Sequence, residues 1–292
     1  MSKLLELTTE NYYSDEANRD YFSCSQFEDF LKCEAMAVAK YEGRYHPEDS
    51  KAFAVGKYFH AAFESAEAFA RYLEENEETI YQKNGKKRAD YVRADQMIQA
   101  AQEDPFIKRL VELPGENEKI MTGKLFGRYP WKIRLDKYVP DSPRLIIDWK
   151  TVGSINERMW SDEEHSRVNF VEAFRYLFRA AVYIEIEKQV TGNETDPAFW
   201  LVCISKEDPP DKAVIALNGS SRQRFDIELE KVKDKIWRFS EIKAGRILPK
   251  RCGRCAYCRA TKKITGVMQY WELDPENAPE LEEEGEFNVA HE

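Results

Sequence analysis

The sequence predicts one α/β domain in which helices cover both faces of a central mixed sheet, with a further helical part at the N-terminus. Apolar residues at helical spacing mark segments on either side of a central group of strands. That group contains an alternating segment at 118–139 and continuous apolar runs at 145–147 and 198–204. A chain of 292 residues can bury such a core, and we expect the domain to span residues 1–272.

The composition limits the class of protein. The net charge of −9 disfavours a general nucleic-acid binder, but it allows a local basic cleft beside acidic metal ligands. The N-terminus lacks the apolar region of a signal peptide and the apolar runs are too short to span a membrane, so we expect a cytoplasmic protein without membrane contact. No Gly-rich phosphate loop and no Ser/His/Asp set is legible, which disfavours a nucleotide-driven motor. An acidic tail at 273–292 is expected to be ordered only in part.

The N-terminal part is expected to become helical after a loosely structured lead-in at 1–20. Ser25, with Glu28 three positions later, is a capping-box pattern for a helix that ends near Cys33. Two further helical segments are expected, at 56–77 and 91–111.

Two polar features accompany these helices. His60 lies at the start of a helical segment, where it is either a structural histidine or a group that reaches a metal or a phosphate. Lys86, Lys87 and Arg88 form a short basic loop, which is either a solvated surface or a contact for DNA phosphates.

The central strands carry the strongest local signal. In the segment 131–136, apolar residues alternate with polar ones, and Asp136 lies on the polar face. After the apolar run at 145–147, Asp148 and Lys150 point to the same face because side chains two positions apart share one side of a strand.

Alone, the pattern of Asp148 and Lys150 favours a surface ion pair over a metal site. However, a turn at 140–143 would join two antiparallel strands and bring Asp136 beside Asp148. Two carboxylates could then hold one divalent cation, with Lys150 placed to orient water and stabilise phosphate charge.

The C-terminal half continues the pattern after a polar loop at 153–167. A helix is expected over 168–189, where Arg175, Arg179 and Tyr183 recur every four residues. This ridge is either ordinary surface decoration or a contact for the DNA backbone. Further strands at 198–204 and 213–217 and a helix over 225–244 complete the domain.

Cys252, Cys255 and Cys258 form two successive C-x-x-C spacings in a basic segment at about 250–263. Such spacing is typical of thiolate ligands for zinc or an iron–sulfur cluster. A fourth ligand has to come from elsewhere. Cys33 is the best candidate, although its position alone favours a small buried hydrophobe, and Cys24 is the next.

With these residues in place, the chain resembles the PD-(D/E)XK nuclease superfamily, in its RecB-type branch, and most of all the RecE-type (exonuclease VIII-like) exonucleases of phages and prophages. The resemblance runs from about residue 23 to 263. The S-x-S…C pattern of this branch is found at 23–33, and its G-x-x-x-H motif ends at His60.

The acids of the resemblance are Asp136 and the D-x-K pair Asp148 and Lys150. Its Q-x-x-x-Y helix is matched by Tyr183, but Arg179 stands where glutamine is usual.

The resemblance implies a restriction-endonuclease-like fold and a set of roles. Asp136, Asp148 and His60 would bind Mg²⁺ or Mn²⁺, Lys150 would activate water, and Tyr183 would lie near the substrate backbone; these five are the expected catalytic residues. Some members of the branch hold a [4Fe–4S] cluster with one cysteine before the histidine motif and three near the C-terminus. Cys33, Cys252, Cys255 and Cys258 fit that layout, but the last spacing is shorter, which leaves a cluster, zinc and bare thiols open.

The expected function is therefore metal-dependent exonuclease action on double-stranded DNA ends in phage or prophage recombination. By resemblance, the expected partners are a RecT-like single-strand annealing protein and further copies of the chain in a ring-shaped tetramer. Two alternatives remain. One is a nuclease of CRISPR adaptation or of a helicase complex, and the other is a non-catalytic DNA-binding scaffold with the same fold.

Overall fold

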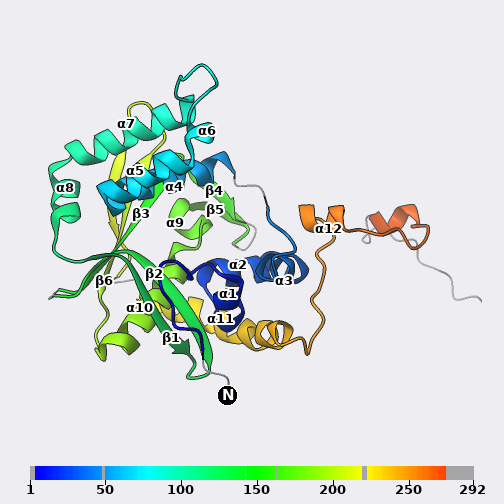
Figure 1. Cartoon of the computed structure of the whole chain (residues 1–292). Helices are drawn as coiled ribbons and strands as arrows, with labels where there is room; N and C mark the ends of the chain where they lie inside the picture. The colour runs from blue at the N-terminus through cyan, green and yellow to red at the C-terminus, as the bar shows by residue number, and fades with distance from the viewer. Residues whose placement is uncertain (1–3, 48–49, 142, 162–163, 219–221, 274–292) are drawn as a thin grey trace, which may run out of the picture. The chain divides into compact units, whose positions relative to one another are not determined.

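The computed structural model describes residues 4–47, 50–141, 143–161, 164–218 and 222–273 (Figure 1). The chain divides into two compact units, Met1–Cys252 and Gly253–Glu292. The predicted acidic tail lies outside the described residues except for Leu273. Within the described ranges, no helix combines the length and the apolar character needed to cross a bilayer.

The first unit contains the predicted mixed sheet. Its five strands lie in the order β1-β2-β3-β6-β7, and only the β3–β6 pair is parallel. The bounds are Glu116–Leu125 (β1), Tyr129–Val139 (β2), Leu145–Val152 (β3), Ala198–Ser205 (β6) and Lys212–Ala216 (β7). The α/β prediction is confirmed.

A second, two-stranded sheet lies where the sequence predicts a polar loop. It pairs β4 (Arg158–Ser161) with β5 (Ser166–Asn169). Among the residues of these two strands only Val168 is buried, so the sequence has no alternation of apolar residues that would predict them. The loop prediction was wrong for these two segments.

Eight helices precede the sheet in the described part of the chain. They are α1 (Asp15–Asp20), α2 (Cys24–Lys32), α3 (Glu34–Tyr41), α4 (Lys51–Glu64), α5 (Ala66–Glu75), α6 (Glu77–Ile80), α7 (Ala89–Glu103) and α8 (Pro105–Glu112). The lead-in at 1–20 is more regular than expected, because Ser14 accepts the Ala17 N–H and caps α1.

The predicted helix boundaries change where a polar side chain caps a new helix. Ser23, not Ser25, caps α2 by accepting the N–H of Gln26 at 3.3 Å. Ser65 accepts the Ala68 N–H and so separates α4 from α5, within what was expected to be one helix. In the same way, a capping aspartate and a proline at the first helical position begin α8 after α7.

The helices pack in two layers on opposite faces of the sheet (Figure 1). On one face, residues of α4, α7 and α8 form an apolar cluster with Ile147 and Trp149 of β3, and Phe63 of α4 stacks on Trp149 at 4.8 Å. On the other face, α2, α10 (Tyr176–Thr191) and α11 (Arg222–Lys243) pack around Phe27, which contacts rings of β2, α10 and α11.

The helix predicted over 168–189 is interrupted. It consists of α9 (Phe170–Ala173) and α10, and Arg175 between them adopts a left-handed backbone with φ 55°. Arg175 therefore does not continue the helical ridge of Arg179 and Tyr183, and that part of the prediction was wrong.

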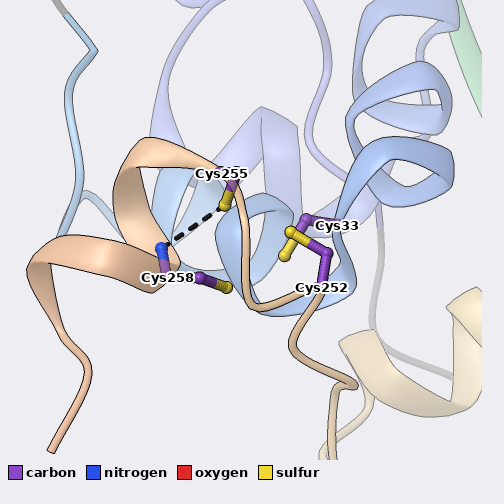
Figure 2. A group of neighbouring side chains, drawn as sticks. All are labelled: Cys33, Cys252, Cys255 and Cys258. Atoms are coloured by element: carbon purple, nitrogen blue, oxygen red, sulfur yellow. Dashed lines mark hydrogen bonds between the residues drawn. The ribbon is translucent and has the colours of Figure 1, made fainter. Parts of the chain in front are cut away.

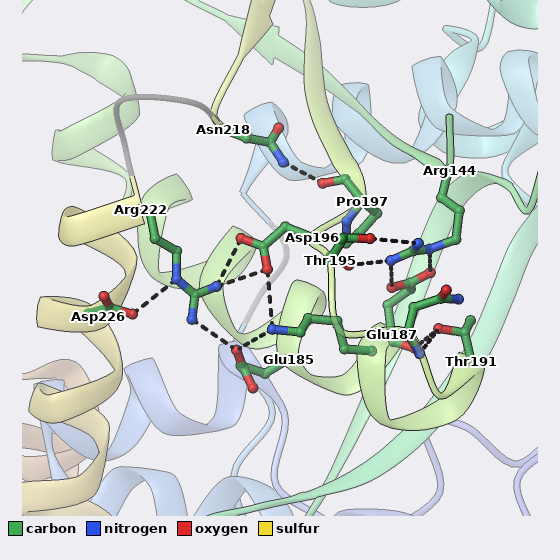
Figure 3. A network of polar contacts seen from close by, with 12 residues as sticks. Arg144, Glu185, Glu187, Thr191, Thr195, Asp196, Pro197, Asn218, Arg222 and Asp226 are labelled. Atoms are coloured by element: carbon green, nitrogen blue, oxygen red, sulfur yellow. Dashed lines mark hydrogen bonds and ion pairs between the residues drawn. The ribbon is translucent and has the colours of Figure 1, made fainter. Parts of the chain in front are cut away.

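A polar network fixes α10 beside the sheet (Figure 3). Glu187, which is fully buried, accepts hydrogen bonds from Tyr138 Oη at 2.7 Å and Arg144 Nε at 2.8 Å. Arg222 of α11 pairs with Asp196 at 2.9 Å and reaches Glu185 of α10 at 3.3 Å. A buried carboxylate with charged and neutral donors is strongly held, so α10 keeps a defined position relative to β2 and β3.

The second unit contains α12 (Ala256–Ala260) and a 3₁₀ turn, η1 (Tyr270–Leu273), among its described residues.

Candidate functional site

The candidate site lies where the hydrogen-bonded pairing of β2 and β3 ends. Pairing runs from Val139↔Leu145 to Lys137↔Ile147 and stops one pair before Asp136 and Asp148. There, Asp136 Oδ2 accepts the main-chain N–H of Trp149 at 2.8 Å. The carboxylate takes the place of a ladder partner, which holds Asp136 against β3.

The Lys150 ammonium lies close to both carboxylates. Lys150 Nζ is 2.5 Å from Asp148 Oδ2 and 3.9 Å from Asp136 Oδ2. Trp149 points to the opposite face, as the strand periodicity predicts. The turn between the strands therefore brings Asp136, Asp148 and Lys150 together.

His60 completes this group from α4. Its Nδ1 lies 3.4 Å from Asp136 Oδ2. Burial lowers the pKa of His60 below its usual value, and the nearby Asp136 opposes that shift only in part. The imidazole is thus neutral at pH 7, which is the form that binds metals.

These residues fit a divalent cation. Asp148 is only 3% exposed. Its Oδ2 accepts no hydrogen bond from the described residues, although the Lys150 ammonium lies close to it. The Trp149 carbonyl also faces the group, since it accepts a hydrogen bond from Lys150 Nζ at 3.1 Å. Carboxylate and carbonyl oxygens are the ligands that Mg²⁺ prefers.

The group opens into a cavity of about 760 Å³, which Tyr183 and Arg179 of α10 also line. Arg179 Nε is buried without an acceptor among the described residues. Burial alone would lower the pKa of Arg179, but Tyr183, Asp148, Cys24 and Glu28 outweigh it and raise the pKa. Arg179 therefore places a permanent positive charge near Asp148.

Of the five predicted basic contacts, Arg179 lines this cavity and the other four do not. Neither Arg175 nor the loop residues Lys86, Lys87 and Arg88 are among its lining side chains. Lys87 Nζ instead binds Asp95 at 2.7 Å and the Tyr58 hydroxyl at 3.1 Å. The DNA contacts of these residues stay predictions.

Sequence reasoning missed several lining residues. Arg134 could have been found, because it shares the polar face of the alternating strand with Asp136. The sequence does point to Glu118, as a further candidate acid on the strand before Asp136; the unbroken β1–β2 register places it opposite Asp136, and its φ is 53°. Glu118 pairs with Arg134, and burial, together with Asp136, raises the pKa of Glu118 to about 7.

Cys33 and Cys252 of the first unit lie where hydrogen bonds hold two segments of the chain together. Cys33 ends α2, and the Sγ atoms of Cys33 and Cys252 lie within 4.8 Å of each other. Ala35 N–H donates to the Lys250 carbonyl at 3.0 Å, and Lys250 N–H donates to Glu34 Oε2 at 2.7 Å. These bonds hold the chain before Cys252 against the start of α3.

In the second unit, Cys255 caps α12, and its Sγ accepts the N–H of Cys258 at 3.4 Å (Figure 2). Their sulfur atoms also lie within 4.8 Å of each other. None of the six cysteines, all of which the structure describes, forms a disulfide. Thiolates are ligands for zinc and iron–sulfur centres, so each of these two cysteine pairs could supply ligands to a metal.

Comparison with known proteins agrees with this geometry. A family model described as a PDDEXK-like domain of unknown function (DUF3799) matches residues 23–261. The chain is also similar to the crystal structure of a provisionally assigned exonuclease from Eubacterium rectale, with 30% identity and a TM-score of 0.83 over 92% of this chain and 98% of that one. A second solved chain, SSO0001, is 15% identical over 80% of this chain and 92% of that one, and its TM-score of 0.29 is too low to bear on the fold. No curated protein is significantly similar.

Proposed function

Because this chain belongs to the PDDEXK-like family, within the PD-(D/E)XK nuclease superfamily, we propose that it is a divalent-metal-dependent exonuclease that degrades DNA from double-stranded ends. Its helix-flanked, mixed five-stranded sheet is the restriction-endonuclease-like fold. Family and structural likeness support a nuclease. The observation that carries the proposal is the meeting of Asp136, Asp148, His60 and Lys150 in one cavity.

Each of these side chains would have a distinct role in phosphodiester hydrolysis. Asp136 and Asp148 would hold the cation, with neutral His60 at its side. A bound Mg²⁺ or Mn²⁺ supplies Lewis-acid stabilisation of phosphate charge and a more acidic water. Lys150 Nζ, between the carboxylates, is placed to orient the attacking water and to donate to a phosphate oxygen. Attack forms a new P–O bond, one ester P–O bond breaks, and the leaving oxygen takes a proton.

The test is digestion of linear and circular duplex DNA in Mg²⁺ by the wild-type protein and by Asp148→Asn and Lys150→Ala. Each variant should lose about a thousand-fold or more in rate, since each removes several kcal/mol of transition-state stabilisation. Lys233→Ala, at a surface ion pair of α11, is the control and should keep full activity.

Wild-type cleavage of linear DNA alone supports exonuclease action from ends. Cleavage of circular duplex would contradict it, and unchanged activity in either site variant would reject the assignment. Absence of any Mn²⁺ binding by calorimetry would instead favour a non-catalytic scaffold. For a recombination role, the proposed partners are a RecT-like annealing protein and, by resemblance, three further copies of the chain.

We also propose that Cys33, Cys252, Cys255 and Cys258 bind one metal centre, either zinc or an iron–sulfur cluster. Support comes from the thiol spacing and from the junction that holds Cys33 beside Cys252. Four thiolates satisfy both kinds of centre.

Metal analysis and the visible spectrum of anaerobically purified protein test this proposal. A broad visible absorption with bound iron indicates a cluster, and a colourless protein with about one zinc per chain indicates a zinc site. Cys33→Ser and Cys252→Ser should each lower the metal content, whereas Cys203→Ala, at a buried core cysteine of β6, should not. Metal-free wild-type protein would contradict the proposal.

A further inference from the structure

The cavity that holds the carboxylates has an exposed aromatic ring on each of two elements. Tyr13, in the segment before α1, is 68% exposed, and Phe53, in the first turn of α4, is 52% exposed. Both side chains line the cavity. Rings left open to solvent inside a site with catalytic residues offer flat apolar faces to a ligand.

Tyr13 is held in place by its neighbours. Its ring packs edge-on against the buried ring of Tyr12 at 4.9 Å. Lys132 fixes Tyr12 through its main-chain carbonyl and lies 4.7 Å from the Tyr12 ring. The Arg134 guanidinium lies 5.3 Å from the Tyr13 ring, and Glu118 pairs with that guanidinium. Tyr13 is thus an ordered ring with a cation beside it.

Tyr13 lines the same cavity as Asp136 and Asp148.

Phe53 repeats this arrangement on α4. The Ser50 hydroxyl accepts the N–H of Phe53 at 3.2 Å and so fixes its backbone. Phe53 lies seven residues, or two turns, before His60, which places both on one helix face. Lys57 Nζ lies 4.4 Å from the Phe53 ring. Each exposed ring is therefore paired with one cation, and both pairs line the cavity that contains His60.

An aromatic face next to a cation suits one ligand class above others. Nucleobases stack on aromatic rings whatever their sequence, and cations beside the rings attract the phosphates between the bases. Inside a duplex, each base face is covered by its neighbours, and a blunt end exposes only the outer face of its last pair. Rings on two separate elements are therefore better filled by unpaired nucleotides.

We propose that Tyr13 and Phe53 are stacking platforms for unpaired nucleotides of the strand being cut, so that the last nucleotides of a double-stranded end enter the cavity unpaired. This inference rests on the proposed nuclease function. It adds the substrate form: a DNA end with unpaired terminal nucleotides. The cations Arg134 and Lys57 serve the adjoining phosphates.

Binding of fluorescent oligonucleotides in Ca²⁺ tests the proposal without requiring cleavage. The probes are a blunt duplex, the same duplex with a four-nucleotide unpaired tail that carries 2-aminopurine, and a tailed duplex with abasic tail positions. Wild-type protein should bind the 2-aminopurine tail more tightly than the blunt duplex and should quench its fluorescence.

Tyr13→Ala and Phe53→Ala should each weaken binding of the tailed duplex about 5- to 100-fold, the range expected for loss of one stacked base. Tyr13→Phe should bind like wild type, because stacking needs the ring and not the hydroxyl. Trp237→Ala, at an equally exposed ring of α11 outside the cavity lining, is the matched control and should change nothing. Abasic tails should bind wild type as weakly as intact tails bind the Tyr13→Ala/Phe53→Ala double variant, and neither substitution should weaken the binding of abasic tails further.

Equal affinity for blunt and tailed duplexes, unchanged binding in both alanine variants, or additive losses with the abasic tail would each overturn the proposal. The outcome is separable from that of the proposed function. Quenching of the tail without cleavage of any DNA in Mg²⁺ would reject the nuclease assignment and support the stacking platforms. Cleavage of blunt ends that neither ring substitution affects would support the nuclease assignment and reject the stacking platforms.

Discussion

At the scale of single residues, buried charges distinguish this protein from a simple apolar core. Lys243, near the end of α11, donates to the carbonyls of Asn18 and Tyr21, each at 2.8 Å, and to Gln26 Oε1 at 2.9 Å. One ammonium thus satisfies three acceptors from α1 and α2 and holds the N-terminal segment that leads to the site. Burial, assisted by Lys132, lowers the pKa of Lys243 to about 7.

This shift predicts how stability depends on pH. Between about pH 7 and pH 10, the unfolded chain keeps a proton on Lys243 that the folded chain has lost, so the free energy of unfolding should rise with pH. The contribution is at most about 1.4 kcal/mol per pH unit. Chemical denaturation at several pH values should show a steeper rise for wild type than for Lys243→Met.

The exposed Lys233 on the same helix provides the control. Its substitution by methionine should leave the pH dependence parallel to that of wild type, because an exposed lysine has similar proton affinity in both states. If Lys243→Met also gave a parallel curve, the buried lysine would be charged throughout this range and the prediction would be wrong.

At the scale of elements, the strands that carry the chemistry were the most predictable part. The alternation at 131–136 and the apolar run at 145–147 gave β2 and β3 their identities, and their antiparallel pairing confirms the expected neighbourhood of Asp136 and Asp148. Helix ends were less predictable. Apolar spacing alone predicts one continuous helix at each of two places where Ser65 and Arg175 in fact interrupt it. Local capping and one left-handed residue decided those ends, and neither alters the apolar periodicity.

At the scale of the whole molecule, the negative net charge of the chain repels DNA, the proposed substrate. The chain has a net charge of −9, yet the cavity places six basic side chains among five acidic ones. The basic set is Lys57, Arg71, Lys132, Arg134, Lys150 and Arg179. The acidic set is Glu64, Glu75, Glu118, Asp136 and Asp148. A bound cation would make the cavity more positive, because it offsets the charge of the two carboxylates nearest the proposed phosphate position.

DNA affinity should therefore depend on a divalent cation even without cleavage. At constant ionic strength, Ca²⁺ should tighten binding of a tailed duplex about tenfold or more relative to EDTA, since the removed repulsion amounts to a few kcal/mol at close range. Fluorescence anisotropy measures this change. Asp148→Asn should reduce the effect of Ca²⁺, and equal affinity in Ca²⁺ and EDTA would contradict the proposed cation site.

The sequence by itself determined the α/β class, the two strands with their carboxylates and Lys150, and the thiol spacing at 252–258. These are local properties, because periodicity and spacing are written along the chain. Only the tertiary structure decided that His60 meets Asp136, that Glu118 pairs with Arg134, and that exposed rings from two separate segments line one cavity. Such groups come together through packing between elements distant in sequence, and the contacts that fix them leave no local periodic pattern.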